Sequence, residues 1–99
     1  MNTLIQSSVF AEWLGGLKDE IGKARILHRM AQATLGNFGD SEPVGEGVSE
    51  LRLDFGPGYR VYFGQVGAQI HLLFGGSKQR QSEYIRRAKK FWKAHDNED

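Results

Sequence analysis

The stretch VSELRLDFGPGYRVYF, residues 48–63, predicts two β-strands and the tight turn between them. Polar and apolar residues alternate from Glu50 onward, which is the period of a strand with one buried face. The triplet GPG, residues 56–58, combines the two residue types that most often turn a chain. The alternation places six side chains on one apolar face: Leu51, Leu53, Phe55, Tyr59, Val61 and Phe63.

Further strands are expected beside this pair. Residues 69–74, QIHLLF, alternate in the same way, and the connection over residues 65–68 is short. Three successive strands with short connections predict an antiparallel meander. Residues 2–7, NTLIQS, predict an edge strand, whereas the glycine-rich stretch GNFGDSEPVGEG, residues 36–47, predicts a loop.

Two helices are expected between the first strand and this loop. Ser7 or Ser8 can cap the first helix, because a hydroxyl there accepts an unpaired backbone N–H, and apolar residues follow at helical spacing from Phe10. Asp19 can open the second helix, and Gly36 can end it because glycine enters the left-handed region without penalty.

A third helix is expected after Ser77, and Ile85 and Ala88 mark its apolar side. The predicted order is therefore β-α-α-β-β-β-α. This order indicates an α+β fold with a small, mainly antiparallel sheet, two N-terminal helices on one face and a basic C-terminal helix.

Length and composition limit the possible classes of protein. Ninety-nine residues, 39% hydrophobic and 25% charged, predict one globular domain over residues 1–99, with residues 96–99 as a disordered acidic tail. The absence of cysteine excludes disulfides and thiolate chemistry. No apolar run approaches the ~20 residues of a membrane span, and no secretory signal is evident. A cytoplasmic location without membrane contact is expected.

The charge is distributed unevenly along the chain. The formal net charge is only +1, but residues 78–95 carry seven basic residues against Glu83 alone. A basic segment on a near-neutral body is a candidate surface for a polyanion, and it can also be an ordinary solvated helix face.

The second face of the predicted sheet collects polar side chains: Glu50, Arg52, Asp54, Arg60, Tyr62 and His71. The loop over residues 75–77 brings Lys78 and Gln81 to the end of the third strand, where a helix N-terminus offers free N–H groups. Guanidinium groups bind phosphate with two hydrogen bonds and an ammonium adds a point charge. This face therefore fits a phosphodiester backbone.

Each of these residues has a structural alternative. Arg52 and Arg60 can form ion pairs with Glu50 and Asp54 on an open sheet face. Tyr62 can pack beneath the last helix, and His71 can be an exposed cross-strand residue.

The residue types on this face can support RNA cleavage without a cofactor. Cations stabilise the charge that develops on the phosphorus oxygens, and the general acid or base remains open among His71, Tyr62, Tyr84 and Lys78. The histidines are scattered and no carboxylates stand at ligand spacing, so no metal site is expected.

The chain resembles the RelE/ParE superfamily of bacterial toxins, in the branch called addiction module killer proteins. The resemblance covers about residues 4–92. Its most specific parts are the glycine-rich stretch before Val48 and the turn GPGYR, residues 56–60. The full set of matching segments is Phe10, Trp13–Leu14, Leu17–Asp19, Gly36–Asp40, Val44–Arg52, Gly56–Phe63, Leu72–Lys78, Gln81, Ile85 and Ala88.

The resemblance implies the toxin of a type II toxin–antitoxin pair, silenced by a small antitoxin that is encoded nearby and often carries a helix-turn-helix domain. RelE-like members are mRNA interferases, endoribonucleases that cleave mRNA on the ribosome and inhibit translation. ParE-like members instead inhibit DNA gyrase, and a non-toxic antitoxin-binding module is a third alternative. Contact with operator DNA would run through the antitoxin.

Matching the motif residue by residue implies a catalytic set of Arg52, Arg60 and Lys78. The residues expected to bind RNA are Tyr62, His71, Arg80, Gln81 and Tyr84. The chain departs from the branch at two positions, where Ser77 and Tyr84 replace the usual aspartates. An acid is thereby lost beside Lys78, and a phenol is added.

Overall fold

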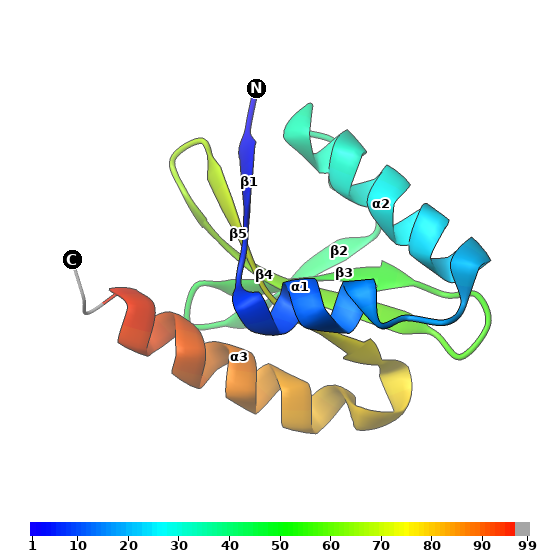
Figure 1. Cartoon of the computed structure of the whole chain (residues 1–99). Helices are drawn as coiled ribbons and strands as arrows, with labels where there is room; N and C mark the ends of the chain where they lie inside the picture. Colours follow the sequence, from blue (N-terminus) through cyan, green and yellow to red (C-terminus); the bar gives the residue numbers. More distant parts are fainter. Residues whose placement is uncertain (97–99) are drawn as a thin grey trace.

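A five-stranded mixed sheet with three helices forms the α+β fold of the computed structural model, which describes residues 1–96 (Figure 1). The elements are, in chain order, β1 (Thr3–Gln6), α1 (Ser8–Gly15), α2 (Glu20–Thr34), β2 (Ser41–Gly45), β3 (Val48–Leu53), β4 (Tyr59–Val66), β5 (Gln69–Ser77), the 3-10 turn η1 (Lys78–Arg80) and α3 (Gln81–Asp96). The predicted acidic tail overlaps α3 at Asp96 and otherwise lies outside the described residues.

The strands lie in the order β1-β5-β4-β3-β2. β3, β4 and β5 form the expected antiparallel meander, and β1 joins β5 in parallel at one edge. The cross-strand register pairs Arg52 with Arg60 and Arg60 with Gly76. Residues far apart in sequence thus meet at the end of the sheet that holds the β3–β4 turn.

The helices α1 and α2 pack on one face of the sheet, with caps at the expected residues. The Ser7 hydroxyl accepts the Phe10 backbone N–H, and the Asp19 carboxylate accepts that of Gly22. Gly36 follows α2 with φ +86°, the left-handed conformation expected of a helix stop. The buried residues on this face are Phe10, Leu14, Ile26, Met30, Ala33, Leu51, Leu53, Tyr59, Val61, Phe63, Ile70 and Leu72.

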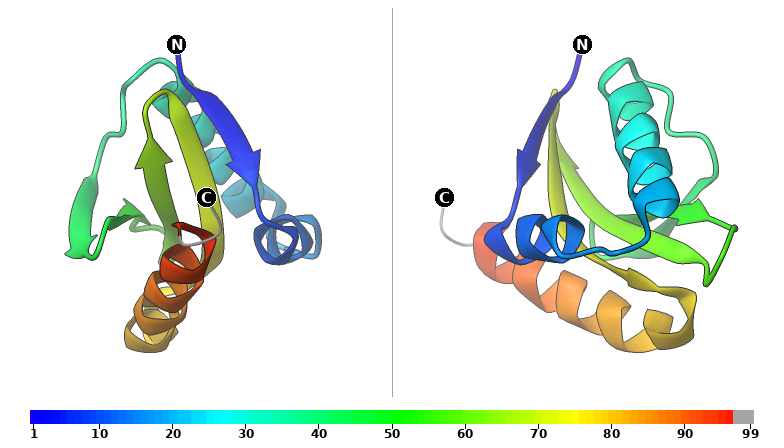
Figure 2. Two further views of the ribbon diagram at one scale, coloured as in Figure 1. Left: turned by 90° about the vertical axis from the view of Figure 1, so that its left-hand side faces the viewer. Right: turned by 45° about the vertical axis from the view of Figure 1, so that its right-hand side comes forward.

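The helix α3 covers the opposite face of the sheet (Figure 2). Its Ala88 and Trp92 are buried there with Tyr62. Two glycines make this approach possible: a Cβ at Gly64 would lie 2.6 Å from the Trp92 ring, and one at Gly76 would collide with the Tyr84 ring. The second sheet face is therefore an interior face.

The segment predicted as a loop over residues 36–47 contains the edge strand β2, so that prediction is wrong for residues 41–45. β2 is irregular: its register with β3 shifts between Pro43 and Gly45, and Pro43 fits only an edge position. The hairpin turn that follows holds Glu46 at φ +54°. Among the described helices, none is long and apolar enough to cross a membrane.

Candidate functional site

A buried polar cluster lies between the sheet and α3. Glu50, Arg60 and Tyr62 are 3%, 4% and 0% exposed, and Glu50 is the cross-strand partner of Tyr62. The sequence predicted an open face here, which is wrong because the apolar side of α3 closes over it. Only the alternative that placed Tyr62 beneath the last helix anticipated this.

The two charged members of the cluster are held by different neighbours. Gln81 at the start of α3 donates from Nε2 to both carboxylate oxygens of Glu50, at 3.0 Å each. Arg60 donates from Nη1 to Asp54 Oδ1 at 3.1 Å and to the Tyr59 carbonyl at 3.0 Å. Because the side chain of Asp54 is 63% exposed, the Arg60–Asp54 pair reaches the surface.

Two polar atoms of the cluster are buried without a hydrogen-bond partner in the described structure: Tyr62 Oη and Arg60 Nε. Burial, and next the negative charge of Glu50, raise the pKa of Tyr62 far above that of an ordinary phenol. Its hydroxyl therefore stays protonated at neutral pH and is no base. With α3 in place, the fully buried Tyr62 also has no surface for RNA.

Arg52 is the cross-strand neighbour of Arg60, but its guanidinium binds different acids. It forms ion pairs with Asp40 at 3.0 Å and Glu42 at 2.7 Å, and its Nε also donates to Asp40. The hydrogen bond to Asp40 is the main reason that the pKa of Arg52 is raised. The predicted alternative of ion pairing is thus confirmed for Arg60, which pairs with Asp54. Arg52 is also ion-paired, but with acids at and before β2 instead of the predicted Glu50 or Asp54.

Lys78 is exposed at the same end of the sheet. Its backbone N–H donates to the Gly58 carbonyl at 2.7 Å, so η1 is tied to the turn that precedes Arg60. Arg52 and Lys78 border different hollows, one between α2 and β3 and one around the start of α3. The expectation that the three cations bind one phosphate stays a prediction.

The remaining predicted residues divide between the site and the rest of the molecule. Tyr84 is half-buried against Gly76, next to Arg60 in the sheet, and the Arg80 guanidinium lies 5.5 Å from the centre of its ring. His71 lies five residues before Gly76 on the same strand, roughly 16 Å away at strand spacing. Its ring is 5.3 Å from that of Trp92, so His71 is outside the cluster.

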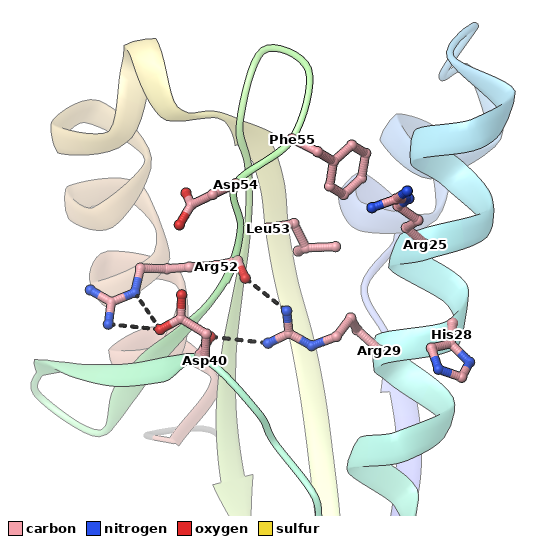
Figure 3. A pocket seen from close by; sticks show the side chains of 8 residues that line it. All are labelled: Arg25, His28, Arg29, Asp40, Arg52, Leu53, Asp54 and Phe55. Atoms are coloured by element: carbon pink, nitrogen blue, oxygen red, sulfur yellow. Dashed lines mark hydrogen bonds and ion pairs between the residues drawn. The ribbon is translucent and has the colours of Figure 1, made fainter.

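Sequence reasoning missed a hollow of about 560 Å³ between α2 and β3, lined by Arg25 and Arg29 of α2 and bordered by Arg52, whose guanidinium points away from α2 toward Asp40 (Figure 3). Arg29 donates to the backbone carbonyls of Arg52 at 2.8 Å and Asp40 at 3.0 Å. The Arg25 guanidinium lies 4.7 Å above the Phe55 ring. The only signal for this hollow was the row of basic residues on the outer side of α2, which by itself does not indicate which strand it faces.

Within residues 1–96 no group of histidines and acids could hold a metal ion. The arrangement offers instead guanidinium groups with exposed carboxylate partners, an exposed ammonium and a half-buried phenol. Such groups bind oxyanions and transfer protons.

Comparison with known proteins finds a close relative. A Haemophilus influenzae protein described as uncharacterized is 46% identical over 81 residues, which are 81% of this chain and 82% of that protein. No family model matches the chain.

Proposed function

The chain belongs to the same family as the Haemophilus influenzae protein, and we propose that it is a RelE/ParE-type toxin that cleaves mRNA on the ribosome. The observation that carries the proposal is the buried cluster of Glu50, Arg60 and Tyr62, flanked at the surface by Arg52 and Lys78. The resemblance of the sequence to that superfamily supports it.

The cluster is costly for stability, which favours a functional reason for it. Buried polar atoms are almost always hydrogen-bonded, and a buried hydroxyl without a partner destabilises a fold. Buried ionic groups are often no more stabilising than apolar residues of the same volume. Tyr62 Oη and Arg60 Nε both lack partners among the described residues. A sheet face that served only to pack α3 would need none of these polar groups.

In the proposed reaction, the 2′-hydroxyl of the RNA gives its proton to solvent and its oxygen attacks the adjacent phosphorus to form a 2′,3′-cyclic phosphate. The bond from phosphorus to the 5′-oxygen breaks, and the 5′-oxygen leaves with a proton from Tyr84. Arg52 and Arg60 bind the phosphate and stabilise the charge of the transition state. Lys78 adds a third cation, and Tyr84 is the phenol best placed to transfer a proton. Gln81 and Glu50 hold the start of α3 against the sheet.

The acids that now pair with the arginines mark where the phosphate would bind. Asp54 and Asp40 are more exposed than the arginines they contact, at 63% against 4% and 50% against 30%. An RNA phosphate can replace each carboxylate as the ligand of the guanidinium, while the displaced acid returns to water. Arg60 then meets the substrate at the surface without leaving its buried position.

The test is mRNA cleavage by the purified chain on programmed ribosomes. Arg52→Gln should lower the rate by about 10²–10³-fold, the usual effect of losing one transition-state contact. Lys18→Gln, which removes one positive charge at an exposed position between α1 and α2, is the control. Arg60→Lys keeps the positive charge but cannot form the bidentate contact of a guanidinium with a phosphate. Circular dichroism checks that this variant folds. Full activity of Arg52→Gln together with Arg60→Lys would refute the assigned roles.

The ion pairs of Arg52 and Arg60 favour two alternatives without catalysis, a ParE-like gyrase inhibitor and a non-toxic antitoxin-binding module. Intact mRNA together with inhibition of DNA supercoiling by gyrase would establish the first. Either toxin would need a cognate antitoxin, and we propose a helix-turn-helix protein encoded nearby that also binds operator DNA. Co-purification of the two chains tests this partner.

A further inference from the structure

The outer side of α3 carries a row of four cations that the proposed cleavage site does not use. Arg86, Lys89, Lys90 and Lys93 follow the spacing i, i+3, i+4, i+7, so they form one stripe about 10 Å long on the helix. Arg86, Lys90 and Lys93 are exposed, and Lys89 is half-buried. We call these four residues the basic ridge.

The described side chains do not neutralise the basic ridge. Among the side chains described, up to Ala94, no carboxylate forms an ion pair with any of the four, and Glu83 pairs instead with Arg80 and Arg87. Like charges three and four residues apart destabilise a helix. The row therefore works against the stability of α3, and it is explained if the ridge has an anionic partner.

The turn between β2 and β3 forms the second wall of this surface. An open hollow of about 390 Å³ lies between the ridge and Glu46. Lys89 packs over the turn, with its Nζ 3.2 Å from the position of a Cβ on Gly45. The negative charge of Glu46 would repel an anion bound in this hollow. Removing that charge should therefore strengthen anion binding, whereas removing a ridge cation should weaken it.

We propose that the basic ridge binds the phosphate backbone of RNA and docks the protein on it, apart from the cleavage site. A straight row of mainly lysine charges without an aromatic side chain suits a chain of phosphates rather than bases, which need stacking platforms. Arg86 lies five residues after Gln81, about 7.5 Å along the helix, so a bound RNA can continue toward the site. The choice of RNA over DNA rests on the proposed function.

The experiment measures binding of a labelled RNA duplex by fluorescence anisotropy over a series of salt concentrations. Lys90→Gln/Lys93→Gln should weaken binding about tenfold at low salt and reduce the slope of log K against log salt by about 1.5–2. Lys18→Gln/Lys23→Gln removes the same charge elsewhere and should leave the slope unchanged. Glu46→Gln should tighten binding.

Equal losses of RNA affinity in both double variants would overturn the proposed role of the basic ridge, because the change in net charge alone would then explain the loss. Tighter binding of a DNA duplex of the same sequence overturns the choice of RNA. Binding of polyglutamate without binding of nucleic acid overturns the proposal in favour of an acidic protein. Since anisotropy requires no cleavage, an RNA-binding but inactive protein refutes only the nuclease. An active protein whose Lys90→Gln/Lys93→Gln variant binds normally refutes only the ridge.

Discussion

Replacing Tyr62 by phenylalanine should stabilise the protein, although Tyr62 is among its largest fully buried side chains. The ring remains and only Oη is removed, an atom without a hydrogen-bond partner in the described structure. Leaving a buried hydroxyl unsatisfied costs about 1–3 kcal/mol. Tyr62→Phe should therefore raise the free energy of unfolding by about 1 kcal/mol, which corresponds to a rise in Tm of about 4–8 °C for a domain of this size.

Urea and thermal unfolding followed by circular dichroism measure this change. The matched control is Tyr59→Phe, since the Tyr59 hydroxyl donates to Asp19 Oδ2 at 2.7 Å and its removal should lower stability. Opposite signs for the two substitutions are the expected result. A loss of stability in Tyr62→Phe would refute the reasoning, because it would mean that Oη has a hydrogen-bond partner, for which Glu50, its cross-strand neighbour, is a candidate.

The same substitution has a consequence at alkaline pH. Because the pKa of Tyr62 is raised above the ordinary 10.0 in the folded state, its proton is held more tightly in the folded chain than in the unfolded chain. The contribution of protonated Tyr62 to the stability of the folded state is fully present below pH 10.0 and decreases as the pH rises further. Tyr62→Phe should therefore show a shallower loss of stability between pH 10 and 12 than the wild-type protein.

Three more perturbations test the packing and the charges. Gly64→Ala should destabilise the protein by about 1–3 kcal/mol, because the new Cβ would lie 2.6 Å from the Trp92 ring; an unchanged urea midpoint would contradict the close approach of α3. The pKa of Asp19 is lowered mainly by the Gly22 N–H, so ionised Asp19 stabilises the fold, and this stabilisation is lost as the pH falls through the acid range. Asp19→Ala should therefore flatten the acid limb of a plot of the free energy of unfolding against pH. Lys90→Gln/Lys93→Gln should raise Tm at low salt, because each like-charge pair costs about 0.2–0.5 kcal/mol; a gain that persists in 1 M salt would not be electrostatic.

The strands of the meander could be predicted because alternation is a local property. Residues 48–63 contain both their period and their turn, and the cap residues Ser7 and Asp19 act within one helical turn. β2 could not be found in this way. Residues 41–45, SEPVG, lack alternation, and they become a strand because β3, which follows after two residues, offers backbone partners along its free edge.

For the candidate site, alternation predicted the face of each residue but not its exposure. Arg60 and Tyr62 do share a face with Glu50, as expected. Whether that face is open depends on α3, and its position depends on long-range packing against Gly64 and Gly76. Gly76 lies in the predicted break over residues 75–77, which is part of β5, and Gly64 lies between the predicted strand and the predicted connection over residues 65–68. Nothing in the local pattern therefore indicated that a helix packs on these two glycines.

The two sets of cations differ in a way that gives them different roles. Arg52 and Arg60 each have a carboxylate within 3.1 Å, so they exert little attraction at a distance and bind a phosphate only by exchanging partners. The four cations of the basic ridge have no such partner in the described structure, and their attraction extends over about a Debye length, 8–10 Å at moderate salt. Under the two proposals, the ridge would therefore determine how fast RNA arrives and how strongly binding depends on salt. The arginines would determine whether a phosphate, once present, is held in the geometry that cleavage needs.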